Sequence, residues 1–301
     1  MTYSIVARDP ETGELGVAVQ SHWFAAGSQV MWAEAGVGAV ATQAMVEPAY
    51  GPRGLSLMRE GRSASAALDA LVGADEGRDH RQVAMVDARG EVAAHTGARC
   101  MREAGHRTAE GVSAQANMML RATVWQAMID AFEASPGPDL AHRLLDALDA
   151  AEAEGGDIRG RQAAGILVVR ATPSGRPWED VALHFRVDDH PEPLAELRRL
   201  VELKGAYERL EAAERLEIAG DLAGALREQQ AALAAYPDHA EIAFWTALGL
   251  AAAGRLDQAR RTIQVAYREH AGWAELLRRL AQDGFLDLPQ ERVAALLPEE
   301  G

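Results

Sequence analysis

The amino-acid sequence predicts an α+β fold, namely a four-layer αββα sandwich, followed by an all-α helical-repeat domain. Short apolar, β-rich runs recur through the first 190 residues, and the helical stretches between them come in pairs. Paired helices between blocks of strands favour a layered sandwich over the one-by-one alternation of a doubly wound sheet. After residue 190 the β signal ends and Ala, Leu, Glu and Arg predominate. We therefore expect two domains, residues 1–190 and 191–301.

The chain opens with a predicted β-hairpin. Residues 3–8 (YSIVAR) and 15–20 (LGVAVQ) are short apolar runs, and the turn-forming residues 9–13 (DPETG) separate them. Residues 37–43 (VGAVATQ) predict a third strand. Helical stretches are expected next, at residues 53–60 and 63–72.

The middle of the predicted sandwich contains three more strands and a pair of helices. The strands are expected at residues 82–87, 92–96 and 112–116. In residues 122–134 the apolar side chains fall on one face of a helix, and the leucines from residue 140 to 148 do the same for a second helix. Two final strands close the domain, at residues 165–170 and 181–187.

A short motif repeats in the C-terminal part of the chain. Ala-Gly-Asp-Leu around Gly220 recurs as Ala-Gly-Arg-Leu around Gly254, 34 residues later. This period resembles the tetratricopeptide repeat, although the helix containing Trp245 is offset from the usual pattern, so the repeat is degenerate. Such repeats predict a surface for a protein partner or for self-association into a homo-oligomer.

Composition excludes several classes of function. The chain has 30 basic and 45 acidic residues, a formal net charge of −15, and both predicted domains are acidic. Negative charge repels phosphate backbones and anionic lipids, so we expect neither nucleic-acid nor membrane binding. No uncharged apolar run is long enough to span a membrane, and no signal peptide is recognisable. With Cys100 as the single cysteine, these features predict a cytoplasmic protein.

Five blocks in the first 190 residues resemble a known family. They are TYSIVARDPETGELGVAVQS, AGVGAVATQA, AYGPRGL, AAHTGARC and GGDIRGRQAAGILVV. Together they resemble the family numbered 1028 among the domains of unknown function. That family is similar to the N-terminal nucleophile (Ntn) hydrolases, whose fold is an αββα sandwich. In such an enzyme the side chain of the first residue attacks a carbonyl, and the free α-amino group of the same residue takes the proton.

The resemblance makes Thr2 the predicted nucleophile and base once Met1 is removed. An α-amine with a pKa of about 7.7–8.0 is substantially neutral near pH 7, as a general base requires. Antiparallel pairing in the hairpin brings Ser21 and His22 close to Thr2. Ser21, His95 and Asn117 are the further catalytic candidates. Asn117 or backbone N–H groups could form an oxyanion hole, and His95 could orient the substrate or the nucleophile.

A second set of polar residues is predicted to bind substrate. Thr42, Gln43 and Gln115 stand at strand ends, where polar side chains reach the mouth of a sandwich. Asp157 and Arg159 lie in the loop before a strand and could bind a charged substrate group. The alternative is structural, because strand-end amides commonly bond loops and an Asp-Arg pair commonly forms an ion pair in a turn.

No cofactor or metal is expected. The spacing of His95, Cys100 and His106 matches no zinc pattern. Residues 36–41 satisfy GxGxxA but continue into a strand, where a dinucleotide site requires a helix. The only lysine, Lys204, lies in the C-terminal domain, so a proteasome-type protease, in which a lysine tunes the nucleophile, is disfavoured.

These observations predict an Ntn-type amidohydrolase that acts on a small amide, ureide or cyclic imide, with Thr2 as nucleophile. The alternative is a non-catalytic ligand-binding αββα module joined to a helical-repeat protein-interaction domain. In that case Met1 is retained and Thr2 only opens a strand.

Overall fold

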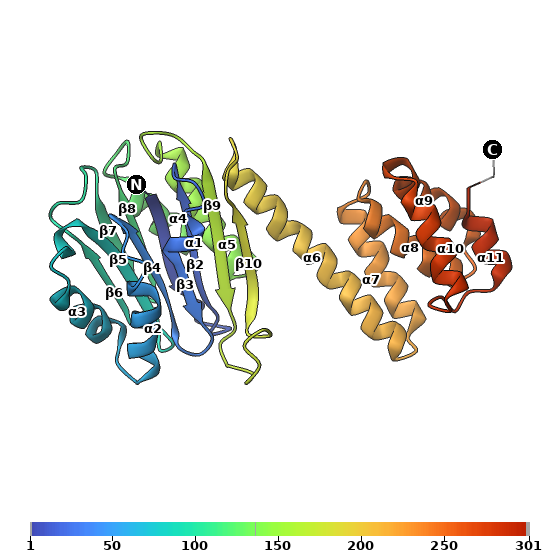
Figure 1. Cartoon of the computed structure of the whole chain (residues 1–301), viewed down its shortest axis with the longest axis horizontal. Helices are drawn as coiled ribbons and strands as arrows, with labels where there is room; N and C mark the ends of the chain where they lie inside the picture. The colour runs from blue at the N-terminus through green and yellow to red at the C-terminus, as the bar shows by residue number, and fades with distance from the viewer. Residues whose placement is uncertain (1, 136, 299–301) are drawn as a thin grey trace. The chain divides into compact units, whose positions relative to one another are not determined.

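The computed structural model describes residues 2–135 and 137–298. The chain divides into two compact units between Val201 and Glu202, and each is described separately (Figure 1). The first unit is a mixed α+β domain built on antiparallel sheets, and the second is helical, as predicted. None of the helices in the described residues is both long and apolar enough to cross a membrane.

The first unit contains two antiparallel sheets. The larger sheet has the strand order β10-β9-β2-β1-β8-β7 and the smaller one β3-β4-β5-β6. The strands of the larger sheet are β1 (Thr2–Arg8), β2 (Leu15–Ser21), β7 (Gly105–Ala109), β8 (Val112–Asn117), β9 (Ala163–Val169) and β10 (Val181–Val187). Those of the smaller sheet are β3 (Met31–Glu34), β4 (Gly38–Ala44), β5 (Arg81–Asp87) and β6 (Val92–Thr96).

The predicted hairpin is the centre of the larger sheet. β1 and β2 pair with Tyr3 opposite Gln20 and Arg8 opposite Leu15. The structure adds two strands that the sequence did not predict, β3 and β7, and each lies at the edge of its sheet. Both are short, and the sequence of β7 (GHRTA) has no apolar alternation. Edge strands of this kind leave little periodic signal because only a few of their side chains are buried.

Two pairs of helices cover the outer faces of the sheets (Figure 1). α4 (Val124–Ala134) and α5 (Leu140–Ala153) pack on the larger sheet, where Leu144 and Leu148 meet Tyr3 and Ile5 of β1. The Tyr3 hydroxyl also donates to Glu152 Oε2 of α5 at 2.7 Å. α2 (Tyr50–Arg59) and α3 (Ala64–Ala74) pack on the smaller sheet. Two short helices complete the unit, α1 (Gly27–Val30) and η1 (Arg78–His80).

The space between the sheets is apolar toward the hairpin turn and polar toward the start of β1. Val6 and Val17 of the larger sheet pack there against Ala39 and Val86 of the smaller sheet. Side chains alternate between the two faces of a strand, so Ser4 and Thr2 continue the same face as Val6. The polar part of the interior is therefore set by the first residues of the chain.

Helix α6 (Pro193–Ile218) begins inside the first unit. Leu194, Leu197 and Val201 belong to the apolar core under α4 and α5. Arg198 extends the contact by pairing with Asp146 at 2.8 Å and with Asp149 at 2.6 Å. The sequence-based boundary after residue 190 marks the end of the strands, whereas the compact unit continues through the first two turns of the next helix.

In its described residues, the second unit contains the rest of α6 and five further helices. They are α7 (Leu222–Ala235), α8 (Ala240–Ala252), α9 (Leu256–Glu269), α10 (Gly272–Gln282) and α11 (Gln290–Leu296). Phe244, Ile263 and Leu277 are fully buried at their centre. The repeated motif forms the same turn twice, because Gly220 before α7 and Gly254 before α9 adopt φ values of 84° and 76°. A left-handed conformation of this kind favours glycine at a helix end.

Candidate functional site

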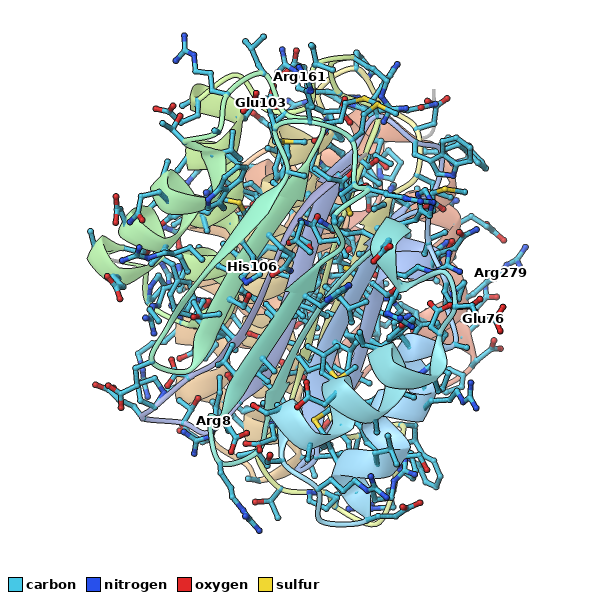
Figure 2. The ribbon with its side chains drawn as sticks, turned by 90° about the vertical axis from the view of Figure 1, so that its left-hand side faces the viewer. Arg8, Glu76, Glu103, His106, Arg161 and Arg279 are labelled. Carbon is cyan, nitrogen blue, oxygen red and sulfur yellow. The ribbon has the colours of Figure 1, made fainter. Side chains whose placement is uncertain are left out.

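One end of the first unit gathers the residues that the sequence singles out. β1 begins there, β2, β4 and β8 end there, and Thr2 lies opposite Asn117. Glu103 and Arg161 mark the loops of this end in Figure 2, and Arg8 marks the opposite end. We call it the Thr2 end.

Thr2 is buried, with 4% of its surface exposed. Its Oγ1 donates to Ser21 Oγ at 3.0 Å. Its carbonyl oxygen accepts from two side-chain amides, Gln43 Nε2 at 3.2 Å and Asn117 Nδ2 at 3.3 Å. Three of the predicted site residues thus contact Thr2 directly, one from each of three neighbouring strands.

Gln82 orients both amides and was missed by the sequence analysis. Its Oε1 accepts from Gln43 Nε2 at 2.8 Å and from Asn117 Nδ2 at 2.9 Å. The two hydrogens of the Asn117 amide are therefore used by Thr2 and Gln82. Asn117 positions Thr2 and has no hydrogen left for a substrate oxygen, so the predicted oxyanion role does not fit its side chain as it is held here.

A second row of polar side chains lies deeper between the sheets. Ser4 donates to Gln43 Oε1 at 2.7 Å, and Gln115 Nε2 donates to Ser4 Oγ at 2.7 Å. Gln115 also accepts from Ser113 at 2.9 Å. Gln115, predicted to bind substrate, instead supports Gln43 from behind. The signal for this row is the alternation of Ser113, Gln115 and Asn117 with small apolar residues.

His106, and not His95, joins the network. Gln82 Nε2 donates to Thr96 Oγ1 at 3.0 Å, and Thr96 Oγ1 lies 2.8 Å from His106 Nδ1. Partial desolvation lowers the pKa of His106, and the nearby His95 lowers it further, so its imidazole is neutral at pH 7. Figure 2 shows His106 on β7, the edge of the larger sheet.

His95 and Thr42 lie on the other face of the smaller sheet. His95 Nε2 contacts the carbonyl oxygen of Arg78 at 2.9 Å, and Thr42 Oγ1 donates to the carbonyl oxygen of Glu47 at 3.1 Å. Their neighbours Thr96 and Gln43 point between the sheets, so strand alternation directs these two toward the helices. The predicted catalytic role of His95 and the substrate role of Thr42 are thus not supported by their positions.

Asp157 and Arg159 form an ion pair. Asp157 Oδ2 accepts from Arg159 Nη2 at 2.9 Å, and its Oδ1 accepts from Arg159 Nε at 3.1 Å. Oδ2 also accepts from the backbone N–H of His22 at 3.1 Å, directly after Ser21. With both oxygens occupied by the protein, Asp157 anchors the loop that begins directly after Ser21, in place of the predicted substrate contact.

Backbone strain is concentrated at the Thr2 end. Among the described residues, the non-glycine residues with positive φ are Ala25 (52°), Ala44 (71°), Glu103 (52°) and Met118 (56°). Ala25, Glu103 and Met118 lie in loops at this end, and Ala44 is the last residue of β4. Ala44 and Met118 directly follow Gln43 and Asn117. Left-handed conformations cost non-glycine residues free energy and cluster at functional sites.

Exposed apolar side chains are concentrated there as well. The first unit has eight large, exposed apolar residues among those described, and six lie in loops at the Thr2 end. We call these six the apolar rim: Trp23, Phe24, Met45, Met101, Leu120 and Ile158. Clustered apolar exposure on a folded domain is typical of a binding surface.

The described residues contain no group of three or more His, Cys, Asp and Glu arranged to hold a metal ion.

Burial raises the pKa of the Cys100 thiol, and its Sγ donates to the carbonyl oxygen of Arg81 at 3.3 Å. A thiol with a raised pKa is a poor nucleophile at pH 7. The Cys100 thiol is therefore a weaker candidate for the nucleophile than Thr2, whose hydroxyl group bonds to that of Ser21.

Residues 2–197 match the model of a family of unknown function, DUF1028. The chain belongs to this family. The resemblance drawn from the five sequence blocks is thereby confirmed at the family level. The match ends inside α6, so helices α7 to α11 lie outside the DUF1028 region.

The DUF1028 region is also similar to solved structures. A crystal structure of a DUF1028 protein from Silicibacter pomeroyi is 33% identical, covers 67% of this chain and 84% of its own, and has a TM-score of 0.60. Anbu (ancestral beta-subunit) from Yersinia bercovieri is 9% identical, covers 66% of this chain and 92% of its own, and has a TM-score of 0.33. No curated protein matches the sequence.

Proposed function

We propose that the DUF1028 region is an Ntn-type amidohydrolase in which Thr2, exposed by removal of Met1, is both nucleophile and base. The observation that carries this proposal is the position of Thr2. The second residue of the chain opens a central strand, and its hydroxyl group lies 3.0 Å from Ser21 Oγ while two amides hold its carbonyl oxygen. Such an anchor fixes the position of the nucleophile.

The described side chains that hydrogen-bond to Thr2 supply no competing base. These side chains, Ser21, Gln43 and Asn117, are neutral, and neither amide nor hydroxyl accepts a proton near pH 7. The α-amine would take the proton from Thr2 Oγ1 as this oxygen attacks the substrate carbonyl carbon. The amine then returns the proton to the leaving nitrogen as the C–N bond breaks. Water hydrolyses the resulting ester with the same amine as base.

The apolar rim supports a substrate with an apolar part. Trp23 and Phe24 follow Ser21 by two and three residues and are 60% and 64% exposed. Burying either aromatic ring against a ligand contributes about 1.5–3 kcal/mol. We therefore propose small amides, ureides or cyclic imides that carry a hydrophobic substituent.

The second candidate is a non-catalytic DUF1028 module that binds a ligand at the same end while Met1 is retained. The observation in its favour is the burial of Thr2, which is 4% exposed. Loss of Met1 separates the two functions, because only the enzyme needs the free amine. The intact mass of the purified protein shows which form exists.

The test compares Thr2→Ala with Thr2→Ser. Alanine keeps the amine and removes the attacking oxygen, so turnover falls by about three powers of ten or more, whereas serine keeps both groups and retains much of the activity. Hydrolysis of amides, ureides and cyclic imides is followed at pH 7.5, and Thr108→Ala on the exposed strand β7 is the control. Wild-type turnover with Met1 still attached, or full activity of Thr2→Ala, would falsify the mechanism.

A further inference from the structure

The helical unit contains a groove that no part of the DUF1028 site explains. It has a volume of about 690 Å³ and is formed by the second half of α6, by α7 and α8, and by residues 285–288. All of these segments belong to the second compact unit. The groove lies outside the family match and has its own surface chemistry.

Its floor and rim are apolar. Leu210, Trp245 and Leu248 line it, and the exposed side chains of Leu222 and Phe285 stand at its edge. Phe285 is 77% and Leu222 is 60% exposed, although each could be buried by an occupant of the groove. An exposed phenylalanine beside a concave apolar surface is typical of a protein-binding site.

The walls are acidic. Five carboxylates line the groove and no cationic side chain does so: Glu211, Glu214, Glu217, Glu241 and Asp287. Glu241 accepts from the Tyr207 hydroxyl at 2.5 Å and Glu217 accepts from Gln229 Nε2 at 2.9 Å. Within the described residues, Glu211, Glu214 and Asp287 form no ion pair. An occupant with positive charge would neutralise them.

A buried, unpartnered oxygen lies in the same groove. Gln229 lines it and is 5% exposed, and its Oε1 has no hydrogen-bond partner among the described residues. Burial raises the pKa of the neighbouring Glu217, and the negative charge of Glu214 raises it further. Both groups would gain from a donor brought in by a ligand, since an unpaired buried acceptor costs about 1–3 kcal/mol.

We propose that this groove binds a cationic amphipathic peptide segment of a partner protein. Its apolar side chains would pack on Trp245 and Leu248, and its Lys or Arg side chains would face Glu211, Glu214 and Asp287. Nucleic acid is excluded as an occupant because the carboxylates repel phosphate. An acidic or neutral segment would leave five carboxylates desolvated without a counter-charge.

The test uses a fluorescein-labelled peptide of about 16 residues that forms an amphipathic helix, with Leu at positions i, i+3, i+4 and i+7 and Arg on the opposite face. Its fluorescence anisotropy is titrated with the full chain, and a peptide with Glu in place of Arg is the comparison. We expect the cationic peptide to bind with a dissociation constant of about 10 µM, and this affinity should fall as the salt concentration rises. The acidic peptide should not bind. Equal binding of both peptides, or no binding of the cationic one, would overturn the proposal.

Matched variants locate the binding. The double variant Glu211→Gln, Glu214→Gln should lower the affinity for the cationic peptide about tenfold. Phe285→Ala should lower this affinity without changing its dependence on salt. Asp283→Asn with Glu291→Gln makes the same change of net charge outside the groove and should leave the affinity unchanged. An equal loss in both double variants would show attraction to net charge alone. Displacement of the peptide by dimerisation of the chain would assign the groove to a second copy.

Discussion

The amides inside the first unit differ in how well the protein satisfies them. Gln43, Gln82, Gln115 and Asn117 all bond one another or nearby groups between the sheets. Gln20 is fully buried on the opposite face of the sheet, and in the described part of the chain neither its Oε1 nor its Nε2 has a hydrogen-bond partner. One face of the larger sheet thus carries a hydrogen-bonded set of polar side chains, whereas Gln20 on the other face is buried with its amide unsatisfied by the described residues.

Replacing Gln20 should stabilise the protein. Gln20→Met keeps the length of the side chain and removes two unpaired polar atoms, so we expect a gain of about 1–2 kcal/mol in the free energy of unfolding. Thermal unfolding should show a rise in Tm of roughly 3–6 °C. The exposed Gln29→Met is the control and should change stability by less than about 0.5 kcal/mol. A lower Tm for Gln20→Met would mean that a bound water or ligand satisfies the amide.

At the level of secondary-structure elements, the non-glycine residues with left-handed backbone lie at strand ends and in loops of the Thr2 end. Ala44 and Met118 each take a left-handed conformation one residue after an amide that holds Thr2. Each of these residues redirects the chain at the end of its strand, so that Gln43 and Asn117 keep their positions in β4 and β8 while the following loop turns away. We interpret the strain as the cost of keeping both amides on Thr2.

Glycine should relieve this strain at Ala44. Ala44→Gly is expected to stabilise the protein by about 1 kcal/mol, because glycine adopts a φ of 71° without a steric penalty. Ala49→Gly, between β4 and α2, is the matched control. Ala49 has a φ of −61°, so glycine there should be neutral or destabilising. Denaturant unfolding measures both variants, and equal effects would show that Ala44 is not strained.

At the scale of the whole molecule, α6 belongs to both units. Its first turns complete the core beneath α4 and α5 through Leu194, Leu197 and Val201, and its second half lines the acidic groove. The helix therefore serves as a structural part of the DUF1028 region as well as the start of the helical unit.

Two truncated chains test this dual role. Residues 1–201 should unfold cooperatively, whereas residues 1–190 lack three buried apolar side chains, each contributing about 1.5–3 kcal/mol. We expect the shorter fragment to lose at least roughly 10 °C in Tm or to show no cooperative transition. The variant Arg198→Ala in residues 1–201 separates the contribution of the ion pairs. Equal melting of the two fragments would contradict a role for α6 in the first core.

Much of the fold and part of the site follow from local sequence patterns. Alternation of apolar residues located most of the strands, and the hairpin alone placed Ser21 beside Thr2, because antiparallel partners are set by the turn. The repeated Gly220 and Gly254 indicated two equivalent turns in the helical unit. Short edge strands such as β7 were not predicted, because few of their residues are buried and the sequence therefore shows no apolar alternation.

The choice of face on each strand depended on the packing of the two sheets. His95 and Thr96 are adjacent polar residues at the end of the same predicted strand. Thr96 hydrogen-bonds within the network between the sheets, whereas His95 points to the helices. Gln82 and His106 lie on strands of different sheets, and both contact Thr96 because the sheets stack. A strand alternates faces at every residue, so its pattern tells which residues share a face. Which of the two faces carries the site depends on what packs against it, either the other sheet or the helices, and this is known only from the tertiary structure.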